Sequence, residues 1–129
     1  MSYFINSTPV IEIVLENPLL SVKYPEEGCV LSVLDTGYQG FAMLPEEVFK
    51  ELKLNELLLD KRKIIMPNGD IIESVGTYGK IVIPELNASK DGFIETSKGV
   101  DEIVLGGEFA RDFRFVLDYC LNKFEIFVC

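Results

Sequence analysis

The feature that most constrains the fold of this chain is the stretch of residues 30–37, which is Val-Leu-Ser-Val-Leu-Asp-Thr-Gly. A mostly apolar run with the length of a buried strand ends abruptly in an acid, a hydroxyl and a glycine. Burial of a carboxylate at the end of such a strand is costly unless a partner compensates it. Asp35 is therefore a candidate reaction centre. Asp-x-Gly is also common turn chemistry, however, and residue types alone favour the turn interpretation.

Length and composition bound the class of protein. At 129 residues, the chain is expected to form one domain over residues 1–129, long enough to bury a core. Its hydrophobic share of 48% and its charged share of 26% are those of an ordinary globular protein. The net charge of −9 argues against nucleic acid and against an anionic membrane surface as partners, because both need a positively charged face.

No signal for export or membrane insertion is found in the sequence. No apolar run approaches the roughly 18–20 residues of a membrane-spanning helix. Residues 1–6 lack the basic and long apolar segments of a signal peptide. The three cysteines, Cys29, Cys120 and Cys129, are odd in number and show no Cys-x-x-Cys spacing. We therefore expect a cytoplasmic, reducing setting with free or packed thiols.

The chain contains no histidine. This excludes the Ser-His-Asp and Cys-His nucleophile systems, the usual zinc and iron triads, and the commonest general base. Chemistry in this chain must then rest on carboxylates, lysine, tyrosine, cysteine or a borrowed cofactor. Because no residue cluster has metal-ligand spacing, we expect neither a metal nor a cofactor.

Alternation and turn residues predict a mostly-β domain with about eight strands and two short helices, closed or sandwich-like in form. Residues 9–16 alternate, with Ile11, Ile13 and Leu15 on one side, which predicts a strand with one wet face. The expected strands are residues 9–16, 29–34, 41–44, 62–66, 70–75, 78–83, 100–105 and 123–128, with short extended segments at 92–96 and 113–117. The expected helices are residues 45–52 and 108–113, and residues 87–91 are expected to form a polar loop.

A β-hairpin is expected where residues 62–66 and 70–75 flank Pro67-Asn68-Gly69. Asn-Gly between two apolar runs favours a tight turn, because both residues tolerate the positive φ that a type I′ turn requires.

From residue 9 to residue 128 the chain resembles the retropepsin-like aspartyl proteases, the family of the retroviral proteases and their bacterial and archaeal relatives. Four features occur in the order that this family shows. The first is the apolar strand 30–34, which runs into Asp35-Thr36-Gly37 and is followed by a helix, and the second is the hairpin around Asn68-Gly69. The third is the hydrophobic-hydrophobic-Gly segment at 103–106 (with Val104, Leu105 and Gly106), which is followed by the helix 108–113. The fourth is the strand 115–118.

The chain looks closest to the small microbial members whose motif continues Asp-Thr-Gly-aromatic, as it does here with Tyr38. Two features depart from the retroviral pattern. Tyr38-Gln39 stands where the retroviral members have a small residue, and the turn at residues 67–70 lacks their glycine-rich tip.

The resemblance implies a closed β-barrel of the retropepsin-like acid protease type with one or two short helices. It also implies an aspartic endopeptidase that hydrolyses peptide or protein substrates through a water molecule activated by two aspartates. This chain has a single Asp-Thr-Gly, so the active form would be a homodimer with Asp35 from each subunit. The strands at 124–128 and 3–5 would supply the dimer sheet.

Roles for individual residues follow from the same resemblance. Asp35 would be catalytic, Thr36 would brace the two loops across the dimer, and Gly37 would let them approach. The hairpin tip would close over the bound peptide as a flap and exclude water. The flap residues would be Met66, Pro67, Asn68, Gly69 and Asp70.

Other interpretations remain open. The main alternative is a non-catalytic module of the same fold that dimerises or binds an extended peptide by strand addition, with Asp35 inert. A third is an all-β fold with a chance Asp-Thr-Gly turn. Other motifs are interpreted structurally: Gly76-x-x-Gly79 as a strand kink, Cys29 as a small buried hydrophobe, Phe109 and Phe113 as core, and the carboxylates Asp91, Glu95, Asp101 and Glu102 as solvated surface.

Overall fold

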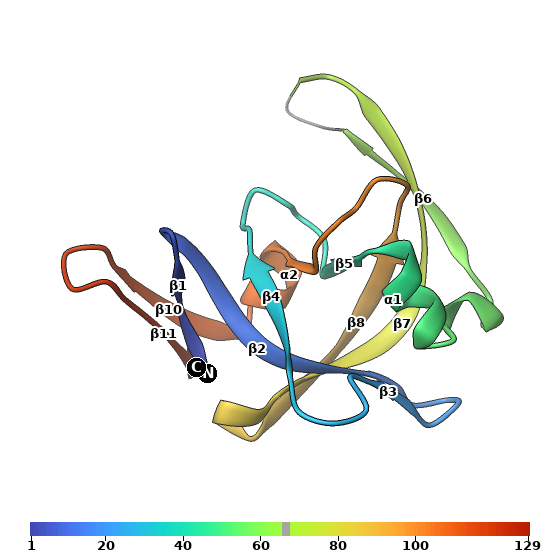
Figure 1. Cartoon of the computed structure of the whole chain (residues 1–129). Coiled ribbons are helices and arrows are strands. Elements are labelled where there is room, and N and C mark those ends of the chain that lie inside the picture. The colour runs from blue at the N-terminus through green and yellow to red at the C-terminus, as the bar shows by residue number, and fades with distance from the viewer. Residues whose placement is uncertain (66–67) are drawn as a thin grey trace.

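The strand β2 (Thr8–Asn17) joins most of the sheet together in the computed structural model, which describes residues 1–65 and 68–129 (Figure 1). Its alternation is as predicted, since Ile11, Ile13 and Leu15 are fully buried. Four strands pair with β2 in antiparallel register. They are β1 (Ser2–Ile5), β3 (Val22–Tyr24), β4 (Val30–Leu34) and β7 (Ile71–Ile83).

The pairings of six strands form a closed circuit. From β2 the circuit passes through β4, β9, β5, β8 and β7 and returns to β2, where Val14–Glu16 pairs with Lys80–Val82. Two of the pairings, β4 with β9 and β5 with β8, are parallel. The strands introduced here are β5 (Ala42–Leu44), β8 (Ala88–Thr96) and β9 (Val104–Leu105).

The strand β6 (Asp60–Ile65) pairs with the first half of β7 and forms a hairpin with it. In Figure 1 the paired ends of β6 and β7 extend beyond the rest of the sheet. A separate two-stranded sheet consists of β10 (Phe113–Asp118) and β11 (Lys123–Val128). It packs beside β1 through ring contacts of Phe4 with Tyr119 and Phe124.

Short helices connect the strands. The helix α1 (Glu46–Glu51) begins after Pro45, with two glutamates in its first turn where the helix dipole favours them. The helix α2 (Gly107–Ala110) follows β9 directly. Two single 3-10 turns, η1 (Leu54–Glu56) and η2 (Pro84–Leu86), follow α1 and β7.

The core is one apolar cluster enclosed by the strand circuit, α1 and α2. Aliphatic residues of β2, β7 and β8 meet the two buried rings Phe41 and Phe109, whose centroids are 6.0 Å apart. The fully buried large side chains are Phe41, Phe109, Ile11, Ile13, Leu15, Leu44, Leu52, Leu54, Ile81, Ile83, Ile94 and Leu105. Phe109 belongs to the core as predicted, whereas Phe113 is only partly buried and stacks on Phe109 at the edge of the core.

The prediction of a mostly-β domain with two short helices is confirmed, but several boundaries were wrong. Residues 70–75 and 78–83 form the single strand β7, and 87–91 is mostly strand rather than loop. The strand expected at 100–105 is reduced to β9, and the helix expected at 108–113 is the shorter α2. Pairing between β7 and β8 runs from Val75–Thr96 to Ile83–Ala88, and this long ladder overrides the local polar character of 87–91.

The expectation that the apolar strand at 29–34 is a buried strand was also wrong in part. Leu31 is 41% exposed, and Cys29 lies exposed before β4 begins, so it is not a buried hydrophobe. The strand β4 therefore has one buried face, formed by Ser32 and Leu34, and one open face.

Within residues 1–65 and 68–129, no helix has the length and apolar character needed to cross a membrane.

The contact between β8 and Phe41 is tight, and it gives the first prediction. A Cβ atom on Gly92 would collide with the Phe41 ring. The substitution Gly92→Ala should therefore overpack the core and lower the free energy of unfolding by about 1–3 kcal/mol. Ser89→Ala, at an exposed position of the same strand, is the matched control and should change stability by less than about 0.5 kcal/mol. Urea denaturation measures both, and equal stabilities would contradict this packing.

Candidate functional site

The Asp35 loop follows β4 and is held mainly by backbone hydrogen bonds. The Asp35 amide donates to the Leu105 carbonyl at 2.9 Å, at the end of β9. The Tyr38 amide donates to the Asp35 carbonyl at 3.1 Å, and the Gly37 amide donates to Asp35 Oδ1 at 2.9 Å. The carboxylate is thus oriented by its own loop, as in an Asx turn.

Asp35, Thr36 and Gly37 are exposed. In the single chain the Asp35 carboxylate faces solvent, so it does not carry the desolvation cost of a carboxylate buried at the end of a strand. Among the residues that the structure describes, no lysine or arginine forms an ion pair with Asp35.

The structure brings the segment Val104-Leu105-Gly106 directly against this loop. The amides of Gly106, Gly107 and Glu108 donate to three carbonyls of the chain after Asp35, at 3.0, 2.8 and 3.2 Å. A Cβ atom on Gly106 would lie only 2.5 Å from the Tyr38 carbonyl oxygen, so only glycine allows this approach. Leu105 is fully buried and Val104 is half-buried.

The tip of the β6–β7 hairpin lies away from the core. Ile65 pairs with Ile71, so residues 66–70 connect the two strands. Asn68, Gly69 and Asp70 are exposed; the Asp70 amide donates to Asn68 Oδ1 at 3.0 Å, and Gly69 has a φ of +89°. The other two proposed flap residues, Met66 and Pro67, lie outside the described residues.

The most heavily hydrogen-bonded side chain near this loop is Glu95 on β8, which the sequence interpretation wrongly assigned to solvated surface. It is fully buried. Arg62 on β6 donates to it twice, from Nε to Oε1 at 3.1 Å and from Nη2 to Oε2 at 2.7 Å. Ser74 Oγ on β7 donates to Oε1 at 2.5 Å, and the Tyr38 hydroxyl donates to Oε2.

Four side chains form this cluster, which we call the Glu95 network (Tyr38, Arg62, Ser74 and Glu95), and two of them have pKa values shifted by it. Burial raises the pKa of the Tyr38 hydroxyl, and its hydrogen bond to Glu95 raises this pKa further. The hydroxyl therefore remains a donor. The hydrogen bond with Glu95 likewise raises the pKa of Arg62, so the guanidinium remains a cation.

A partial signal for Glu95 was present in the sequence. It is an acid between Ile94 and Thr96 in a stretch of strand-forming residues, where a charge requires compensation if the strand is covered on both faces. Its partners could not be read from the sequence, because Arg62 is distant along the chain and is placed beside Glu95 only by the β6–β7–β8 order.

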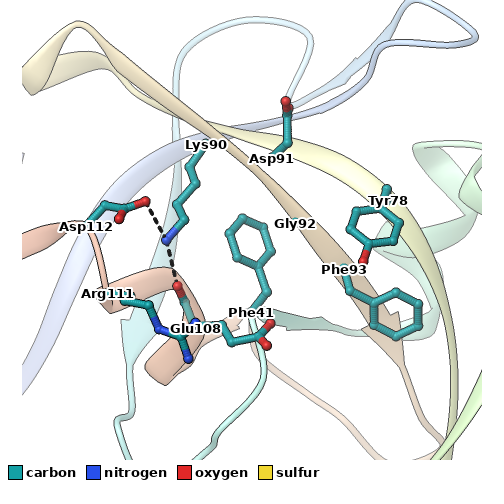
Figure 2. Close-up of a pocket in the computed structure, with 9 residues that line it drawn as sticks. All are labelled: Phe41, Tyr78, Lys90, Asp91, Gly92, Phe93, Glu108, Arg111 and Asp112. Atoms are coloured by element: carbon teal, nitrogen blue, oxygen red, sulfur yellow. Dashed lines mark hydrogen bonds and ion pairs between the residues drawn. The ribbon is translucent and has the colours of Figure 1, made fainter.

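Two cavities of about 310 Å³ each lie elsewhere on the chain, and Asp35 lines neither. Figure 2 shows the first, between β8 and α2. In it, Lys90 Nζ donates to the Glu108 carbonyl at 2.7 Å and pairs with the Asp112 carboxylate at 2.9 Å, so this lysine anchors α2 to the sheet. Its lining residues are Phe41, Tyr78, Lys90, Asp91, Gly92, Phe93, Glu108, Arg111 and Asp112.

The described ranges contain no candidate metal site, because no three acids or cysteines in them are grouped closely enough to hold an ion. The Asp35 loop presents an accessible carboxylate that is held in one orientation by hydrogen bonds from the backbone. This carboxyl group can accept a proton when it is ionised and donate one when it is protonated.

The Glu95 network gives the second prediction. Arg62→Met removes the cation from a fully buried carboxylate and should lower the free energy of unfolding by about 2–4 kcal/mol. We expect a smaller loss of stability than for an ion pair whose two side chains are both fully buried, because the Arg62 side chain is 42% exposed. Lys63→Met, the exposed neighbour on β6, is the control and should be nearly neutral. Thermal or urea unfolding measures both, and a neutral Arg62→Met would contradict the buried ion pair.

Comparison with known proteins places the chain in a family. No family model matches it. A protein of Archaeoglobus fulgidus that is described only as uncharacterized is 60% identical to it over 126 residues, which cover 98% of each chain. Because this identity extends over nearly the full length of both sequences, the chain belongs to the same protein family as the Archaeoglobus fulgidus protein.

Proposed function

We propose that this chain is one protomer of a homodimeric aspartic endopeptidase with a retropepsin-like β-barrel. The observation that carries the proposal is the Asp35 loop itself. Its carboxylate is exposed at the end of β4, and its backbone is held by the segment Val104-Leu105-Gly106 on the parallel neighbour β9. The closed circuit of six strands supports the barrel assignment.

The proposed reaction needs two carboxylates with different protonation states. Two aspartates about 3 Å apart cannot both ionise, so they share one proton. The ionised carboxylate takes a proton from water, whose oxygen bonds to the peptide carbonyl carbon, while the protonated carboxyl donates to the carbonyl oxygen. The leaving amine then takes the proton that the first carboxylate removed from water, and the bond from carbon to nitrogen breaks. A hydroxyl of the intermediate returns a proton to the second carboxylate, which restores the singly protonated pair.

The second carboxylate would come from another copy of the same chain. No other aspartate is followed by Thr-Gly or Ser-Gly, and the exposure of Asp35 leaves it accessible to a partner loop. In this dimer Thr36 would brace the two loops, and Gly37 would permit their close approach.

The β6–β7 hairpin suits the role of a substrate cover. Its paired strands extend beyond the sheet in Figure 1, and its tip residues Asn68, Gly69 and Asp70 are exposed. An extended peptide would lie between this hairpin and the two Asp35 loops, where closure excludes water and strengthens the electrostatic interactions.

The dimer contact is proposed at the terminal strands β1, β10 and β11. Several large apolar side chains on and between these strands are exposed in the single chain, and a partner could cover them. They are Ile5, Val116, Leu117, Tyr119, Leu121 and Val128.

The third prediction tests the catalytic residue. Asp35→Asn removes the ionisable group and should lower peptide cleavage by about a hundredfold or more, while sedimentation still shows a dimer. Asp101→Asn, an exposed aspartate outside the loop, should retain the wild-type rate. Cleavage that survives Asp35→Asn would exclude the dyad. A dimer that binds peptide without cleaving it would instead support the non-catalytic module.

The fourth prediction concerns pH and metal dependence. Cleavage should show a bell-shaped pH profile with its optimum on the acid side, because only the singly protonated dyad is active. Below the lower apparent pKa both carboxyls are protonated, and above the higher one both are ionised. Chelators should leave the rate unchanged, since the mechanism uses carboxylates alone. A rate that rises to a plateau at alkaline pH, or that is lost with chelator, would contradict the proposal.

A further inference from the structure

The Glu95 network connects the two segments that the proposed reaction would use, the Asp35 loop and the β6–β7 hairpin. Tyr38 belongs to the Asp35 loop, Arg62 and Ser74 belong to the two strands of the hairpin, and Glu95 lies between them on β8. The junction is tightly packed beside Gly40, because a Cβ atom on Gly40 would collide with the Tyr38 hydroxyl and lie 2.9 Å from Glu95 Oε2.

On the loop side, Tyr38 cannot move independently of Asp35. The Tyr38 amide donates to the Asp35 carbonyl at 3.1 Å, and the Tyr38 carbonyl accepts from the Gly107 amide at 2.8 Å. The Tyr38 backbone is therefore part of the turn that contains Asp35, and its hydroxyl connects this turn to Glu95.

On the hairpin side, Arg62 and Ser74 are directly opposite each other on β6 and β7. The two side chains converge on the same carboxylate oxygen, Oε1 of Glu95, so both strands are fixed at one point. Arg62 also lies over the Phe93 ring, 5.4 Å from its centroid. The next pair on this face toward the tip is Ile64 with Ile72.

We propose that Glu95 is a positioning residue that couples the hairpin to the Asp35 loop, so that movement of one is transmitted to the other. Glu95 is not itself a catalytic residue, because it is fully buried and accepts four hydrogen bonds. When a buried carboxylate loses one hydrogen-bond donor, its remaining hydrogen bonds weaken or rearrange. Loss of a donor on one segment therefore affects the other segments that are bound to the same carboxylate. The catalytic consequence of the coupling rests on the proposed function, but the coupling itself does not.

The fifth prediction perturbs the hairpin and measures the loop. Ser74→Ala removes one donor to Glu95 from β7. Amide hydrogen exchange at Gly37 and Gly107 should then become about tenfold faster or more, which corresponds to the loss of one hydrogen bond to a charged group. The matched control is Ser97→Ala, because Ser97 is also buried and donates to the Glu73 carbonyl of β7 at 2.8 Å, outside the Glu95 network. It should leave exchange at Gly37 and Gly107 close to the wild-type rate.

The reverse experiment uses Tyr38→Phe, which removes only a hydroxyl from the loop side. Faster exchange at Ile64 and Ile72 in the hairpin is the expected result. The proposal is overturned if Ser74→Ala accelerates exchange in the hairpin alone, or if Tyr38→Phe accelerates it in the loop alone, because each change would then remain local.

Peptide kinetics separate this inference from the proposed function. If the chain is a protease, Ser74→Ala should lower kcat as well as raise KM, whereas an uncoupled hairpin would change KM alone. Wild-type protein that cleaves no peptide but shows coupled exchange would refute the proposed function and support the coupling. An active wild type in which Ser74→Ala changes only KM, with local exchange, would leave the protease standing and refute the coupling.

Discussion

The pairing of β2 with β7 is the constraint on which the rest of this structure depends. Without it, the sheet would be an open ribbon from β1 to β6; with it, six strands close on themselves around one apolar cluster. Within this circuit the parallel pairing of β4 with β9 puts the ends of these two strands side by side, and the Asp35 loop is held at that junction by the Leu105 carbonyl. The same closure leaves β6 outside the circuit, which allows the β6–β7 hairpin to extend away from the core.

Features that depend on neighbouring residues were predictable from the sequence, and features that depend on distant partners were not. The alternation of β2 and a helix beside Pro45 follow from local chemistry, and both were predicted, although α1 begins at Glu46 rather than at Pro45 itself. The merging of 70–75 with 78–83 into β7 was missed, because Gly76 and Gly79 resemble interruptions. In the structure they instead allow close contact: a Cβ atom on Gly76 would lie 2.5 Å from the Ile94 carbonyl oxygen.

The residues of the candidate site show the same difference between features set by local sequence and features set by distant partners. Asp35 and the segment Val104-Leu105-Gly106 could both be named from their sequence motifs, but their mutual hydrogen bonds required the fold. Glu95 was misassigned because an isolated glutamate resembles surface, and its compensation comes from Arg62, Ser74 and Tyr38 on three other segments. Side chains of the Glu95 network are constrained more strongly than the exposed Asp35, because the folded protein loses stability with every donor that is removed from a buried charge.

The hydrogen bond from the Asp35 amide to the Leu105 carbonyl also has a consequence for the order of folding. The β6–β7 hairpin and the β1–β2 pair use contacts close in sequence, which form early and at low entropic cost. The Asp35 loop, by contrast, is completed only when residues 104–108 dock against it from the other end of the chain. During synthesis, residues 104–108 are added after the strands β1 to β8, so the hydrogen bonds that hold the acid-bearing loop can form only after these strands have been made.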